Sequence, residues 1–289
     1  MVVVAVAGGT SGLGRSIVEA LISQGKNQVL ILSRKKSPAL EASLGAPITV
    51  VDYTSPSSIE SSLEAHNIDT VICTINSQVD LEPELNLILA ADRSRPTRRI
   101  IPSIFTGFPY PVKLIPPPPL TLFSGAGKNA RRDRTDTLRF RYPDSTPVAR
   151  AKSQVLKAVQ QTSLEYTAFY NGILLDYYGA PGMGMKSNQP PWPLFVDILN
   201  ERAAVPGSGD VPVVFTHTSD IAKFVVASLD LAVLAPAGMW FVNRELDLDP
   251  TYALNSDFPD IALVRVKEFL DLPWARGATA AATPPEVRM

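Results

Sequence analysis

The chain has 289 residues, with 27 Lys and Arg against 28 Asp and Glu and a formal net charge of −1. This balance gives no field that would hold the protein on nucleic acid or on an acidic membrane, so we expect neither partner. Because 45% of the residues are hydrophobic, the chain can bury a sizeable core, which excludes bulk disorder.

Cysteine and histidine are scarce. With one cysteine, Cys73, and two histidines, His66 and His217, the chain can form neither an internal disulfide nor a thiolate or imidazole metal cluster, so we expect no metal. A reducing compartment, the cytoplasm, suits such a chain. Residues 1–4 carry no positive region and no cleavage pattern, which predicts a strand and not a secretion signal. The apolar stretch 224–242 is interrupted by an aspartate, a proline and a glycine, so we expect no membrane span.

The first hundred residues alternate between short β-branched runs and helical patterns. This alternation is typical of βαβ units that build a parallel sheet buried on both faces, and it predicts a doubly wound, Rossmann-type α/β fold. At one helix start, Ser57 and Glu60 have the spacing of a capping box. The predicted strands are Val2–Ala7, Gln28–Leu32, Ile48–Val51, Thr70–Thr74 and Arg99–Ile101, and the predicted helices are Gly12–Ser23, Ser57–His66 and Pro83–Asp92.

The alternation breaks at residues 109–147, which contain four consecutive prolines and a basic run. Few apolar residues there can be buried, so we expect a flexible insert. A solvated loop, a basic lid over an anionic substrate and retained untranslated sequence are the alternatives. A helix near Arg150–Thr162 and a strand at Tyr166–Tyr170 then complete a predicted cofactor-binding core, residues 1–170. Residues 171–289 are expected to form a smaller substrate-binding lobe with a frayed tail at residues 275–289.

A glycine-rich loop follows the first predicted strand and leads directly into a helix. Gly8 permits a tight turn out of the strand, Gly12 lets the backbone approach a pyrophosphate, and Gly14 lets the helix pack closely on the sheet. The helix N-terminus adds N–H donors and a partial positive charge for the phosphates. A tight turn that binds nothing is the alternative. The predicted phosphate-binding residues are Gly8, Thr10, Ser11, Gly12, Leu13 and Gly14.

Basic residues follow the second predicted strand, where an enzyme for the unphosphorylated dinucleotide carries an acid. Arg34 can contact a 2′-phosphate through two hydrogen bonds and Lys35 can add a charge, so the sequence favours NADPH over NADH; an ordinary solvated turn is the alternative. Residues after the third and fourth strands complete the expected cofactor site, with an acid placed to accept from the adenine amino group. These residues are Asp52, Tyr53, Thr74 and Asn76.

Several stretches of the chain are similar to the motifs of one protein family. The loop follows the family's GxxGxxG form with Ser11 at the middle glycine, and residues 102–105 resemble its PSEF segment with Ile104 in place of glutamate. Residues 171–179 are similar to its NGFFLDYYG stretch, and residues 206–210 and 220–224 continue the match. The chain thus resembles the atypical short-chain dehydrogenases related to isoflavone reductase and the NmrA-like proteins, in their fungal branch.

The resemblance also suggests a catalytic residue. Standard short-chain dehydrogenases use Tyr-x-x-x-Lys, and no tyrosine of this chain has a lysine four residues later. Isoflavone reductase-like enzymes use instead a lysine at the start of the helix before the sixth strand, and the run from Lys152 to Tyr166-Thr167 is similar to that pattern. The resemblance therefore implies that Lys152, and not the nearby Lys157, contacts the cofactor and serves as general acid/base. A surface lysine is the alternative.

Four residues are expected to line the substrate site: Phe105, Tyr170, Asn171 and His217. The alternatives are core aromatic side chains, a turn formed by Asn-Gly, and a structural loop histidine. We expect an NADPH-dependent reductase that transfers hydride to a C=C, C=O or C=N bond of a small substrate, aromatic or a secondary metabolite, as a monomer or homodimer. The alternative is a non-catalytic NmrA-like regulator that binds the dinucleotide to report redox state.

Overall fold

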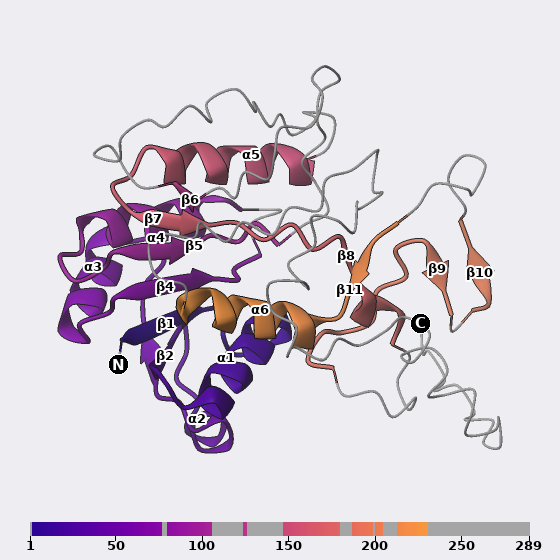
Figure 1. Cartoon of the computed structure of the whole chain (residues 1–289), viewed down its shortest axis with the longest axis horizontal. Helices are drawn as coiled ribbons and strands as arrows, with labels where there is room; N and C mark the ends of the chain where they lie inside the picture. Colours follow the sequence, from indigo (N-terminus) through magenta and orange to yellow (C-terminus); the bar gives the residue numbers. More distant parts are fainter. Residues whose placement is uncertain are drawn as a thin grey trace, which may run out of the picture.

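The computed structural model describes residues 2–76, 80–105, 124–125, 147–179, 187–198, 200–204 and 213–230. Most of them form a sheet with helices on both faces (Figure 1), which confirms the predicted Rossmann-type α/β fold. The predicted insert at 109–147 lies outside the described residues except for its last residue and the strand β6 (Ser124–Gly125), and the predicted tail at 275–289 lies wholly outside them.

The main sheet has the strand order β3-β2-β1-β4-β5-β7-β6. Its first six strands are parallel, and β6 pairs antiparallel with β7. The order reverses between β1 and β4, and at such a point an open parallel sheet leaves a crevice for ligands. The strands are β1 (Val3–Ala7), β2 (Gln28–Ser33), β3 (Ile48–Val50), β4 (Thr70–Cys73), β5 (Arg99–Ile101) and β7 (Glu165–Thr167).

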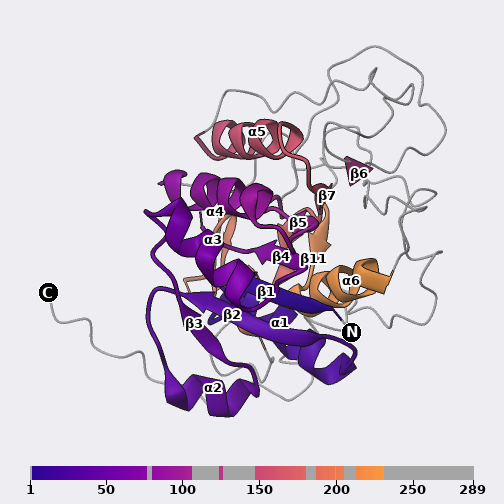
Figure 2. The ribbon, with the colours of Figure 1, turned by 90° about the vertical axis from the view of Figure 1, so that its left-hand side faces the viewer.

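Each face of the sheet has its own apolar core. Along β1, Val4 and Val6 belong to one cluster of buried residues and Ala5 and Ala7 to the other, as the two-residue period of a strand requires. One face is covered by α3 (Pro56–Ala65), α4 (Glu82–Arg93) and α5 (Pro147–Gln160), and the other by α1 (Gly12–Gln24), α2 (Pro38–Leu44) and α6 (Thr218–Asp230), as Figure 2 shows.

Three helices, α3, α4 and α5, start one to three residues before the predicted position, and each start contains proline. In α3 the cap is Ser55, whose hydroxyl accepts from the Ser58 amide at 3.3 Å, so the predicted capping box at Ser57 and Glu60 is wrong. Proline lacks an N–H group and has a fixed φ suited to the first helical position, so Pro56 moves the start forward. In the same way α5 begins at Pro147, ahead of the predicted Arg150.

A smaller group of elements, called the smaller lobe, follows β7 between residues 171 and 216. Strand β8 (Ile173–Leu174) pairs with β11 (Phe215–Thr216), β9 (Val196–Asp197) pairs with β10 (Arg202–Ala203), and the short helix η1 (Leu175–Tyr178) lies between β8 and β9 in the chain. Helix α6, although it comes after these elements, returns to pack on α1 (Figure 1). In the part of the chain that the structure describes, no helix has the length and apolar character to cross a membrane.

Candidate functional site

The residues predicted to bind cofactor or substrate follow neighbouring strands of the sheet. The glycine loop follows β1, Thr74 follows β4, Phe105 lies beyond β5, and Asn171 lies beyond β7. In the sheet these strands are adjacent, in the order β1-β4-β5-β7. Since parallel strands end at one edge, the four segments meet at the carboxyl edge, where the ligands of open α/β sheets lie.

The glycine loop is held in very close contact with β4. Gly8 has a φ of +82°, and the Thr74 hydroxyl donates to the Ala7 carbonyl at 2.8 Å. A Cβ atom at Gly14 would lie 2.3 Å from both the Gly8 carbonyl oxygen and Thr74 Oγ1. Only glycine fits at that position, so α1 approaches the strand as a dinucleotide loop requires.

The first turn of α1 lies at the site where a pyrophosphate would bind. Ser11 is its cap residue and is exposed, Thr10 is half-buried and Leu13 is buried. The amides of this turn have no acceptor within the helix, so those of Leu13 and Gly14 are suited to phosphate oxygens. The cradle therefore fits a dinucleotide.

A segment from the smaller lobe contacts the same turn. The Asn188 carbonyl accepts from the Gly12 amide at 3.1 Å, and the Asn188 side chain donates to Ser16 Oγ at 3.1 Å and to Glu19 at 2.9 Å. A Cβ atom at Gly12, whose φ is +53°, would lie 2.7 Å from the Gln189 side-chain oxygen. Nothing in the sequence pattern links residues 188 and 189 to the glycine loop, because the contact spans more than 170 residues.

The basic residues after β2 are exposed. Arg34 and Lys35 are the first two residues after β2. The Lys35 amide donates to Ser33 Oγ at 3.3 Å. Burial raises the pKa of Tyr53, and the positive charge of Arg34 opposes this rise. Arg34 and Lys35 both lie just beyond the second strand, where this fold binds the ribose of a dinucleotide.

The two residues after β3 differ in accessibility. Asp52 is exposed and accepts from the Thr54 hydroxyl at 2.7 Å and from the Thr54 amide at 2.9 Å, and these hydrogen bonds lower its pKa from the usual value of an aspartate. Tyr53 is buried, and its hydroxyl donates to the Leu32 carbonyl at 3.1 Å. Burial raises the Tyr53 pKa. Asn76, beyond β4, is exposed at the same edge.

Lys152 is buried near the start of α5, with 7% of its surface exposed. Its ammonium donates to the Ser103 carbonyl and, at 3.2 Å, to Ser103 Oγ. Lys157 on the same helix is exposed. The helix therefore directs Lys152, and not Lys157, toward the carboxyl edge of β5.

Three of the predicted substrate residues pack around the end of β7. Phe105 stacks on Phe169 with ring centroids 5.7 Å apart, and Tyr170 is buried. Asn171 is 1% exposed, its carbonyl accepts from Thr216 Oγ1 at 2.6 Å, and within the described chain its side-chain oxygen has no hydrogen-bond partner. Gly172, with a φ of +71°, makes the turn that follows.

His217 belongs to a buried polar cluster at the start of α6. Its Nε2 lies 3.4 Å from Asp176 Oδ1, and its Nδ1 lies 2.8 Å from Ser219 Oγ. Asp176 is fully buried and accepts from the amide and the hydroxyl of Thr218 at 2.8 and 2.6 Å, and from the Ser187 hydroxyl. Through Asp176 the cluster links η1 to residue 187 and to the start of α6. His217 is part of this link because it lies beside Asp176.

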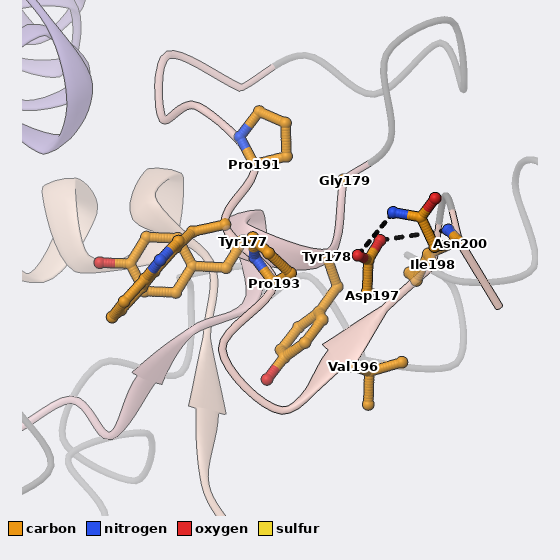
Figure 3. Close-up of a pocket in the computed structure, with 10 residues that line it drawn as sticks. Tyr177, Tyr178, Gly179, Pro191, Pro193, Val196, Asp197, Ile198 and Asn200 are labelled. Atoms are coloured by element: carbon orange, nitrogen blue, oxygen red, sulfur yellow. Dashed lines mark hydrogen bonds between the residues drawn. The ribbon is translucent and has the colours of Figure 1, made fainter. Parts of the chain in front are cut away.

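An aromatic pocket of about 230 Å³ lies in the smaller lobe, between η1 and β9 (Figure 3). The Tyr177 ring meets the Trp192 ring edge to face at 5.2 Å, and Trp192 is 49% exposed. On the other side Asn200 donates to Asp197 at 2.7 Å. The pocket thus combines apolar walls with a polar rim. Its lining residues are Tyr177, Tyr178, Gly179, Pro191, Trp192, Pro193, Val196, Asp197, Ile198 and Asn200.

Comparison with known proteins identifies the family of the chain. The model of the NAD dependent epimerase/dehydratase family matches residues 4–238. The chain belongs to this family. It is 35% identical over 233 residues to "Oxidoreductase BOA1" of Botryotinia fuckeliana, an alignment that covers 80% of this chain and 67% of the relative. It is 28% identical over 250 residues to "Oxidoreductase swnN" of Metarhizium robertsii, covering 83% and 67% of the two chains.

Solved structures of other proteins share the fold. The structure "AtPrR2 with NADP+ and (+)pinoresinol" has a TM-score of 0.56 and 19% identity and covers 93% of this chain and 80% of the other. "Crystal Structure of Isoflavone Reductase" has a TM-score of 0.57 and 14% identity and covers 93% and 98%. The predicted likeness to isoflavone reductase-like proteins is confirmed, and the chain is an NAD(P)-dependent oxidoreductase.

Proposed function

We propose that this family member is an NADPH-dependent reductase that delivers hydride to a C=C, C=O or C=N bond of a small substrate, with Lys152 as general acid. The observation that supports this most is the buried Lys152 ammonium at Ser103, at the carboxyl edge of β5. The glycine loop lies two strands away, at β1. Two strand spacings are about 10 Å, which a bound dinucleotide readily spans.

The preference for NADPH rests on Arg34 and Lys35. Both side chains are exposed just beyond β2, and no acid follows that strand before residue 41. A guanidinium can hold a phosphate through two charge-assisted hydrogen bonds, while a ribose hydroxyl offers it no negative charge. The 2′-phosphate of NADPH therefore gains contacts that NADH lacks.

The bound cofactor would supply the hydride, and the chain would supply the proton. Hydride addition to one end of the double bond leaves an electron pair on the other end, which takes a proton from Lys152 Nζ. An ammonium has three N–H groups, and the two contacts with Ser103 orient two of them. In the proposed reaction the third would face the reacting atom, and burial of the side chain would limit competition from water.

The aromatic pocket of the smaller lobe supports an apolar, ring-containing substrate. Tyr177 and Trp192 offer ring faces and edges to such a molecule, and Asp197 and Asn200 offer polar groups at the rim. Rings packed in this manner gain about 0.5–1.5 kcal/mol beyond the burial of their area.

Replacing Lys152 by alanine tests the proposed role. We expect Lys152→Ala to lower kcat by about 10²–10⁴-fold on ketone, imine or enone substrates, because general acid assistance is lost, while NADPH affinity changes by no more than a few-fold. Lys157→Ala is the matched control on the same helix and should retain full turnover. Equal turnover by the two variants would contradict the proposal. So would cofactor-dependent binding of a partner protein by a wild-type chain that reduces none of these compounds, which is the behaviour of a sensor.

A further inference from the structure

A second charged group lies behind Lys152. Glu84, in the first turn of α4, has no exposed surface. Carboxylates are almost never fully buried unless they are paired, because removing the charge from water is unfavourable. Its neighbour in the same turn, Glu82, is exposed. The burial of Glu84 therefore calls for specific partners.

One partner of Glu84 is the backbone that holds Lys152. Glu84 Oε1 accepts from the Ser103 amide at 2.8 Å. The Ser103 hydroxyl donates to the Ile75 carbonyl at 2.9 Å, and the Ser103 carbonyl and hydroxyl both accept from Lys152. One residue is thus fixed by α4 through its amide and by β4 through its hydroxyl, and it presents its oxygens to α5.

The charges of Glu84 and Lys152 both act on the pKa of a third buried group, the Cys73 thiol. Burial raises the pKa of the Cys73 thiol, the negative charge of Glu84 raises it further, and the positive charge of Lys152 opposes this effect. Both charged groups therefore act on the same buried thiol at the end of β4. Residues from four elements or their ends, β4, α4, β5 and α5, meet at this point.

We propose that Glu84 is the positioning residue for Lys152. By accepting from the Ser103 amide, Glu84 fixes the orientation of the peptide whose carbonyl receives the Lys152 ammonium. Without this acceptor the Ser103 segment turns away and Lys152 loses its place at the carboxyl edge. The catalytic consequence rests on the proposed function, whereas the structural link between Glu84 and Lys152 does not.

The test measures how accessible Lys152 is to acetic anhydride, with the acetylation of exposed Lys157 as internal reference, by mass spectrometry of peptides. Glu84→Met keeps the side-chain volume and removes the acceptor, Glu84→Gln keeps the acceptor, and Glu82→Ala removes an exposed carboxylate from the same turn. We expect the Lys152 to Lys157 ratio to rise about tenfold or more in Glu84→Met, as loss of a hydrogen bond to a charged group implies. In Glu84→Gln and Glu82→Ala it should stay within about threefold of wild type.

An unchanged ratio in a folded Glu84→Met variant would overturn the proposal, and so would a Glu84→Gln variant as reactive as Glu84→Met. If Glu84→Met does not fold, hydrogen exchange of the Ser103 amide in wild type and Glu84→Gln decides. Protection in both supports the proposal, and exchange at the rate of an unstructured amide in either overturns it.

With a substrate, Glu84→Met should lose kcat about 10–100-fold at unchanged NADPH affinity, and Glu84→Gln should restore it. If Lys152→Ala keeps full turnover while the acetylation result holds, the proposed function fails and the Glu84 link stands.

Discussion

At Gly14, helix α1 lies so close to the glycine loop and to the residue after β4 that there is no room for a side chain. Gly14 faces the Gly8 carbonyl and the Thr74 hydroxyl, and a Cβ atom there would lie 2.3 Å from each. The Gly8 carbonyl belongs to the backbone and cannot swing away as a flexible side chain can. The loop geometry is therefore sensitive to one methyl group.

We expect Gly14→Ala to lower NADPH affinity by about tenfold or more, because the added methyl displaces the loop from the pyrophosphate position. Fluorescence titration of NADPH measures the affinity, and circular dichroism checks the fold. Gly25→Ala is a useful comparison, since a Cβ at Gly25 meets no atom within 4 Å, although its φ of +68° strains any side chain. A folded Gly14→Ala variant with wild-type affinity would show that the phosphates bind elsewhere.

Cys73 offers a second test at this scale. Burial raises its thiol pKa, and the negative charge of Glu84 adds to the effect, so the thiolate needed for alkylation is scarce at pH 8. We expect the native protein to resist iodoacetamide at pH 8 and to react fully after unfolding in urea, as measured by intact mass. Rapid alkylation of the folded protein would contradict the burial of this cluster.

At the scale of elements, local signals predicted the strands of the sheet well. Short β-branched runs mark β1, β2 and β4. Each of these three strands differs from its predicted bounds by one residue, at one of its two ends. The seven-residue helix α2 was not predicted, because so short a segment gives little periodicity. The return of α6 onto α1 depends on contacts between distant residues, which local patterns do not carry.

The same limit explains which site residues the sequence did not indicate. Glu84 stands beside exposed Glu82 on an amphipathic helix, where an acid is typical of the solvated face. Only the fold brings it to Ser103. Lys152, by contrast, was predicted through a family resemblance, and the structure shows it buried at the expected edge of the sheet. Its chemical role stays a proposal.

The packing of α6 gives a prediction for this scale. Phe224 is 3% exposed in the apolar cluster that α6 shares with α1, so Phe224→Ala should lower the free energy of unfolding by about 3–5 kcal/mol. Urea denaturation measures the loss. Asp230→Ala, at the end of the same helix, removes an exposed ion pair with Lys26 and should cost less than about 1 kcal/mol. Similar effects of the two substitutions would argue against α6 as part of the core.

At the scale of the whole molecule, the smaller lobe and the sheet meet beside the cofactor loop. Asn188 binds the first turns of α1, while Asp176 links η1 to the start of α6. The aromatic pocket lies in the same lobe. A dinucleotide at the carboxyl edge would therefore lie next to the segments that carry the proposed substrate pocket, as a reductase requires.

The most direct test of this account is the affinity of the wild-type chain and of Arg34→Ala for NADPH and NADH, measured by fluorescence titration. We predict that wild type binds NADPH about 10–100-fold more tightly than NADH, because a charged two-bond contact contributes roughly 1.5–3 kcal/mol. Arg34→Ala should lose most of that preference by weakening NADPH alone. Equal affinities in wild type, or a preference unchanged in Arg34→Ala, would contradict the assignment of this chain as an NADPH-dependent reductase.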